Sequence, residues 1–195
     1  MKLIVGFPHC PDFDPENEGW QRLKEPKLKA AVVIGHLAGL LLGGLTYFAV
    51  VAWSDFSFEQ SFEELDLWLL PLMVAMITLH ERLHALGHPG WGLMPSTRYG
   101  VIPKILLFYA HYDANVTRNR FIVILIVPFI GLTVVPLFLA IVWPPAAQLA
   151  GFIAILNAAF SGLDLFNAWI TYWHAPAGAI MRNQGWQSYW RLAHA

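Results

Sequence analysis

The residues most suited to chemistry are His80-Glu81-Arg-Leu-His84, which follow an apolar run beginning near Leu67. Two histidines four residues apart lie one turn apart on a helix, so both imidazoles can bind one metal ion. The glutamate beside them can accept and return a proton. Charged residues inside a bilayer-spanning segment are costly and usually face a partner or a cavity. The motif and its setting therefore predict a metal site.

A catalytic zinc ion needs three protein ligands and one open position, so the two histidines require a third partner. Asp164 is the favoured candidate, because it is the only acid in the last two apolar segments. His88 is the second candidate, although Gly87 and Pro89 flank it and are expected to end the helix. A metzincin-like continuation would need a histidine at position 90, where the chain has Gly90.

The segment that contains Asp164 has one polar face, formed by Asn157, Ser161, Asp164 and Asn167. His80 and Asp164 are expected to lie about 20 and 23 Å from the outer ends of their segments, at similar depths. Asn157, Ser161 and Asn167 can orient the carboxylate or bind a substrate carbonyl. Hydrogen bonds between helices explain the same three residues equally well.

The composition is that of an integral membrane protein. Hydrophobic residues make up 57% of the chain and charged residues only 13%. The net charge of -1 gives no reason to expect a nucleic-acid partner. Cys10 is the only cysteine, which excludes an intrachain disulfide and a cysteine cluster. Any metal site is therefore expected to use His, Asp and Glu.

The apolar segments predict an all-α membrane protein whose four transmembrane helices cover about residues 28–53, 67–87, 121–143 and 149–173. The acidic loop at 54–66 has no Lys or Arg, whereas the N-terminal segment, residues 91–119 and the C-terminal segment do. Both termini are therefore expected in the cytosol. The expected parts are a loosely packed cytosolic arm at 1–27, a membrane domain at 28–174 and a cytosolic interfacial tail at 175–195.

Two details of the helices can be predicted. Gly35, Gly39 and Gly43 recur every four residues on one face of the first helix, which would let another helix approach closely. Pro128 and Pro136 should kink the third helix or open its backbone.

Two apolar, aromatic-rich runs surround Pro103 and predict a short membrane-edge β-hairpin around residues 97–112. Such a hairpin offers an edge strand to which an extended peptide could add. His111 lies in this region, where it is either a substrate contact or, more often for such a residue, a surface or interfacial histidine.

Several short segments together carry a family resemblance: His80-Glu-Arg-Leu-His84-Ala-Leu, Phe108-Tyr-Ala-His-Tyr112, Arg120-Phe, Val127-Pro-Phe129, Asn157 and Ser161-Gly-Leu-Asp164. In these the chain resembles the Putative zincin peptidase family of small bacterial membrane proteins, which is similar to the intramembrane site-2 proteases. The resemblance covers roughly residues 67–172. It implies that His80, His84 and Asp164 bind Zn²⁺ and that Glu81 is the catalytic base. Leu165 follows Asp164, where site-2 proteases have a glycine.

The expected function is that of a zinc-dependent intramembrane metalloprotease, an HExxH-type metallopeptidase of the bacterial inner (cytoplasmic) membrane. Its substrate would be a membrane-tethered protein. The alternative is a catalytically silent descendant of the protease fold that serves as a structural subunit or adaptor in a larger membrane complex. A membrane metal-binding or transport protein is a third class, but the chain lacks the further intramembrane acids or histidines that a conducting path needs.

Overall fold

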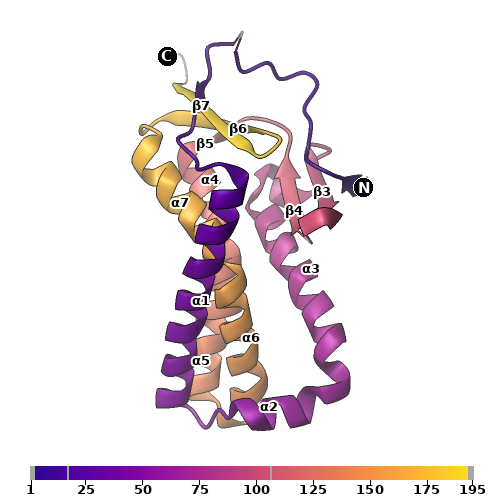
Figure 1. Ribbon diagram of the computed structural model, residues 1–195, viewed down its shortest axis with the longest axis vertical. Coiled ribbons are helices and arrows are strands. Elements are labelled where there is room, and N and C mark those ends of the chain that lie inside the picture. Colours follow the sequence, from indigo (N-terminus) through magenta and orange to yellow (C-terminus); the bar gives the residue numbers. More distant parts are fainter. Residues whose placement is uncertain (1–2, 17, 106, 193–195) are drawn as a thin grey trace. The chain divides into compact units, whose positions relative to one another are not determined.

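The computed structural model describes residues 3–16, 18–105 and 107–192, which are mostly helical with two small sheets (Figure 1). The chain divides into two compact units. The helical unit contains Val32–His80 and Val127–Phe166. The sheet unit contains the described residues up to Ala31, Glu81–Ile126 and the described residues from Asn167 onward.

Close helix packing in the helical unit depends on glycines of α1 (Leu28–Trp53). A Cβ atom added at Gly39 would lie 2.1 Å from the carbonyl oxygen of Ala159, and one at Gly35 would lie 2.9 Å from the Cβ of Leu163. A Cβ at Gly43 would lie 3.2 Å from that of Ala159. The predicted packing role of these glycines is confirmed.

The third apolar segment forms one long helix with a wider turn in its middle. It consists of α4 (Arg118–Phe129), a π-helical turn η4 (Ile130–Val134) and α5 (Val135–Val142). Pro128 and Pro136 flank the π-helical turn. Neither proline nitrogen can donate the helical hydrogen bond, so the regular α-helical pattern is interrupted between them. The predicted opening of the backbone is confirmed.

The fourth apolar segment is not one helix as expected. After η5 (Pro144–Ala146), the chain forms α6 (Ala147–Phe160) and α7 (Gly162–His174), which are bent by 52° relative to each other. At the break, the hydroxyl of Ser161 donates a hydrogen bond of 2.8 Å to the carbonyl of Asn157. Gly162 is so close to α1 that a Cβ there would lie 2.3 Å from the Gly35 carbonyl oxygen.

The acidic segment expected as a loop contains a helix, α2 (Phe58–Leu65), which η1 (Asp66–Trp68) connects to α3 (Leu69–Gly87). The side chain of Ser57 caps α2 by accepting a hydrogen bond from the backbone N–H of Gln60. Beside these elements lies a buried cluster formed by Val50, Phe56, Phe152 and Ile155.

Two helices of the described chain are long and apolar enough to cross a membrane, Leu28–Trp53 and Arg118–Val142. The bent pair Pro144–Phe160 and Gly162–His174 makes a third if it counts as one span. Helix α3 is less apolar than these helices, because it carries the polar residues of the His80-Glu81-Arg-Leu-His84 motif.

The first sheet of the sheet unit has the order β1-β3-β4, with β1 (Leu3–Val5), β3 (Thr97–Ile102) and β4 (Leu107–Tyr112). Strands β3 and β4 are antiparallel, are joined through η3 (Pro103–Ile105) and pair Arg98 with His111. The predicted hairpin is confirmed. Strand β1 adds to β3 in parallel.

The prediction of an all-α protein is wrong, because the chain also forms a second sheet that was not predicted. Its strand order is β2-β7-β6-β5. Its strands are β2 (Gln21–Arg22), β7 (Gln187–Leu192), β6 (Ala179–Gln184) and β5 (Val116–Thr117). The C-terminal segment thus forms a hairpin, which turns at Gly185 with φ of 61°. Glycine adopts this left-handed backbone without a steric penalty.

The N-terminal arm is packed against the second sheet rather than loosely attached, so that part of the prediction is wrong. Cys10, Phe13 and Trp20 form a buried cluster, and Ile180 and Tyr189 of the β6–β7 hairpin pack against it. The arm is too short for a core of its own, but the hairpin supplies the other half.

Candidate metal centre

The motif residues lie together on α3. His80 and His84 are both buried, and their ligand atoms and that of Glu81 all lie within 4.8 Å of one another. This grouping is what the spacing of four residues on a helix predicts. The motif therefore has the geometry of an HExxH metal-binding group.

The imidazole of His80 has a partner on each of its nitrogens. Nδ1 lies 2.8 Å from Oδ1 of Asn157, and Nε2 lies 3.1 Å from Oδ2 of Asp164. Two ligand atoms of a tetrahedral zinc ion, each about 2.05 Å from the metal, are separated by about 3.3 Å. The His80 and Asp164 ligand atoms are thus at the separation that a shared zinc ion requires.

The amide of Asn157 fixes which nitrogen of His80 carries hydrogen. Asn157 is fully buried, and its Nδ2 donates to the Pro128 carbonyl at 3.1 Å and to Oγ1 of Thr133 at 2.9 Å. Because a carbonyl can only accept, Nδ2 must face Pro128, which leaves Oδ1 facing His80. His80 therefore donates through Nδ1–H, which leaves a lone pair on Nε2, the nitrogen that lies beside Asp164.

His84 is oriented by the backbone of α4. Its Nδ1 donates a hydrogen bond of 2.7 Å to the carbonyl oxygen of Ile124. In a regular helix that oxygen would accept from the N–H four residues later, but position 128 is a proline and has no N–H. Pro128 thus frees the acceptor that holds His84, which leaves Nε2 as the ring nitrogen available to a metal ion.

We expect Asn157→Leu to destabilise the protein by about 1–3 kcal/mol, since it leaves buried polar groups without their partner. It should also weaken zinc binding by about 10- to 100-fold, because the His80 ring loses the acceptor that orients it. Unfolding in detergent and metal titration measure the two effects. Asn167→Leu is the matched comparison, and an equal or larger effect at Asn167 would contradict this assignment.

The other residues predicted for the site have different surroundings. Ser161 is fully buried, and its Oγ lies 3.3 Å from Nδ2 of Asn157. Asn167 is half-buried on α7, after the bend, and its backbone carbonyl accepts from Thr171. The break between α6 and α7 therefore interrupts the predicted polar stripe.

The structure does not group His88, the second candidate for third ligand, with the motif histidines. It lies just before η2 (Pro89–Gly92), and its Nδ1 is 3.2 Å from Oγ1 of Thr97. Its ring packs on that of Tyr112, with centroids 5.2 Å apart. Burial lowers the pKa of His88 to about 4.

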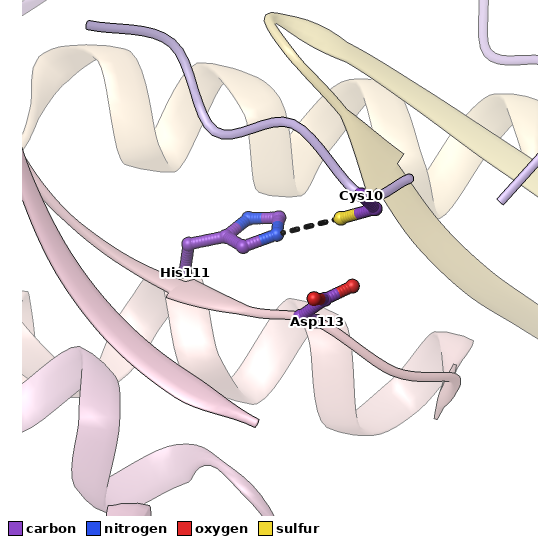
Figure 2. A group of neighbouring side chains, drawn as sticks. All are labelled: Cys10, His111 and Asp113. Atoms are coloured by element: carbon purple, nitrogen blue, oxygen red, sulfur yellow. Dashed lines mark hydrogen bonds between the residues drawn. The ribbon is translucent and has the colours of Figure 1, made fainter. Parts of the chain in front are cut away.

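His111 belongs to a second group of side chains. It is buried on β4, so its interpretation as a surface histidine is wrong, and its Nε2 lies 3.3 Å from Sγ of Cys10 (Figure 2). The ligand atoms of Cys10, His111 and Asp113 all lie within 4.8 Å of one another. This group combines a thiol with an imidazole and a carboxylate, so its composition differs from the set of His, Asp and Glu expected for a metal site.

Two arginines hold the carboxylate of Asp113. Nη2 of Arg98 lies 2.7 Å from its Oδ2, and Nη2 of Arg182 lies 3.2 Å from its Oδ1. Burial alone would raise the pKa of Asp113, but hydrogen bonds from Cys10 and Arg182 and the charge of Arg98 outweigh it and lower the pKa. Burial lowers the pKa of His111 to about 4, and burial together with a hydrogen bond to Asp113 raises that of Cys10 to about 12.

Sequence reasoning missed Thr133, Cys10 and Asp113. Thr133 could have been singled out from the sequence, because its hydroxyl lies inside an otherwise apolar segment. His111 and Asp113 could have been singled out too, because residues two apart along an extended chain point to the same side. Nothing in the sequence pairs Cys10 with them, since about a hundred residues separate the two segments.

A comparison with protein families matches residues 73–180, more than half of the chain, to the family described as Putative zincin peptidase. The match includes the motif on α3 as well as Asn157 and Asp164. No curated protein and no solved structure matched the chain. With the buried HExxH group on α3 and this match, the chain belongs to the zincin peptidase family so described.

Proposed function

We propose that this protein is a zinc-dependent intramembrane metalloprotease, similar to the site-2 proteases, that hydrolyses a peptide bond of a membrane-tethered protein. The proposed zinc ligands are His80, His84 and Asp164. One observation carries the proposal: Nε2 of His80 and Oδ2 of Asp164 lie 3.1 Å apart, while Nδ1 of His80 is already bonded to Asn157. This is the arrangement of a metal-binding histidine with a supporting partner.

Glu81 is the proposed general base. When bound, zinc would polarise the scissile carbonyl and lower the pKa of the attacking water toward about 7. Glu81 takes the proton from that water and returns it to the leaving amine. A site that only binds zinc for structure has no use for this carboxylate, and its place beside the ligand atoms supports a catalytic role.

The proposed topology has four spans: α1, α3, the α4–α5 helix and the bent α6–α7 pair, with both termini in the cytosol. The positions of Lys and Arg support this orientation. The motif residues of α3 fall in its last two turns, so they would lie toward the cytosolic end of the membrane. We place the protein in the inner membrane of a bacterium.

The substrate would bind in an extended form, because helical peptide bonds are hydrogen-bonded and shielded from attack. Strand β4 is at an edge of the described β1-β3-β4 sheet, which supports the addition of a substrate strand there. The π-helical turn between Pro128 and Pro136 is a proposed gate, since such turns are often found at functional sites.

Zinc content of purified variants tests the proposed metal centre. His80→Ala and Asp164→Ala should each lose about one zinc ion per chain, since two of three protein ligands do not hold the metal. His36→Ala is the matched control, because His36 is exposed on α1 and its Nδ1 bonds to the Val32 carbonyl of its own helix at 2.7 Å. Equal zinc in all four proteins would refute the centre. Zinc loss in the first two variants without cleavage by the wild type would favour the silent adaptor.

A further inference from the structure

The Cys10, His111 and Asp113 group is separate from the residues of the proposed protease site and lies wholly within the sheet unit. It brings a thiol, an imidazole and a carboxylate together. The thiol comes from the N-terminal arm, while the other two come from β4 and the residue just after it. In Figure 2 the three side chains converge, with His111 and Asp113 both directed toward Cys10.

We propose that Cys10, His111 and Asp113 form a second divalent-metal site, which fastens the N-terminal arm to the β3–β4 hairpin. Sulfur and imidazole ligands favour Zn²⁺ and Co²⁺ over Mg²⁺ or Ca²⁺, which prefer oxygen ligands. Three protein ligands within 4.8 Å leave a fourth position for water in a tetrahedral site. This inference does not depend on the protein being a protease.

Each of the three donors is held in place by contacts of its own residue. The backbone N–H of Cys10 donates to Oε1 of Gln184 at 2.9 Å, and Nε2 of Gln184 donates back to the Cys10 carbonyl at 3.3 Å. The backbone of His111 is paired with Arg98 in the hairpin. The N–H of Asp113 donates to the Ser96 carbonyl at 2.8 Å. A metal ion would therefore meet preorganised ligands.

The arginines around Asp113 are compatible with a metal ion and also limit its affinity. Arg98 and Arg182 each bond to a different oxygen of the carboxylate, and each oxygen keeps a further lone pair. Such partners fix the orientation of a ligating carboxylate. Their positive charge repels a bound cation. The negative charge that the Cys10 thiol gains when it loses its proton offsets this repulsion. Binding forms a metal–sulfur bond, breaks the S–H bond of Cys10 and releases its proton to solvent.

Cobalt titration of the metal-free full-length protein tests this site specifically. Because Cys10 is the only cysteine, a thiolate-to-cobalt charge-transfer band in the near ultraviolet can come only from this group. We expect the band to saturate by about two cobalt ions per chain in the wild type, because the proposed protease centre also takes one, and at about one per chain in His80→Ala. Cys10→Ser should abolish it, and His111→Gln should shift its midpoint to at least about tenfold higher cobalt.

Two control variants make the outcome decisive. His9→Ala changes an exposed neighbour of Cys10 and should keep the band. His80→Ala removes a proposed protease ligand and should also keep it, so failure of the protease proposal would not affect this one. A folded wild-type protein without the band would overturn the proposal, as would a band that His111→Gln and Asp113→Asn leave unchanged. In that case the contacts of Cys10 serve packing alone.

Discussion

Glu81→Gln is expected to abolish peptide-bond hydrolysis while zinc remains bound. The substitution keeps the size of the side chain and one hydrogen-bond-accepting oxygen but removes the group that accepts the proton of water. General-base catalysis typically contributes about 10²- to 10⁴-fold to a rate, so turnover should fall by that factor. The measurement is cleavage of a panel of single-span membrane proteins, each labelled at both ends, by protein reconstituted in liposomes.

Glu63→Gln is the matched control, because Glu63 is exposed on α2. It should cleave the panel as the wild type does. Zinc content must be measured in parallel, since a loss of zinc in Glu81→Gln would mean that this carboxylate binds metal rather than moves a proton. Full cleavage by Glu81→Gln would refute its role as the base.

Gly39→Ala is expected to be the most damaging small substitution in the helical unit. The added Cβ would lie 2.1 Å from the Ala159 carbonyl oxygen, a backbone atom that no side-chain rotation can move. Helices α1 and α6 would have to separate, and such overpacking costs about 1–3 kcal/mol or more. Thermal unfolding in detergent should show a clearly lower midpoint.

Gly44→Ala is the control for this effect within the same helix. A Cβ at Gly44 meets nothing within 4 Å, and alanine is favoured over glycine in a helix interior by about 1 kcal/mol. Its unfolding midpoint should therefore be unchanged or higher. Equal midpoints for the two variants would show that the close approach of α1 to α6 does not contribute to stability.

The parts of the fold that the sequence predicted are those with local signals. The glycine face of α1, the opening between Pro128 and Pro136 and the hairpin of residues 97–112 each follow from spacing within one segment. The second sheet could not be predicted in this way. Its strand β2 has two residues, and its partner β7 is more than 160 residues away.

The candidate site shows the same division. The spacing of His80 and His84 on a helix is a local signal, and the structure agrees with it. The amide of Asn157 was recognised as a polar residue in an apolar segment, but its bond to His80 spans 77 residues. The argument about membrane depth related His80 to Asp164 and not to Asn157, so this contact could not be predicted. The bend after Phe160 could not be predicted, because serine and glycine, the residue types at Ser161 and Gly162, are common within helices that cross membranes.

The two motif histidines differ in how easily mutation can disturb them. His80 depends on a side chain, that of Asn157, and a single codon change can remove that partner. His84 depends on a backbone carbonyl, that of Ile124, which every residue type at position 124 would supply. Its availability is set instead by Pro128, whose missing N–H leaves the oxygen free. One half of the centre is thus genetically fragile, whereas the other is robust to any substitution of the residue that it touches.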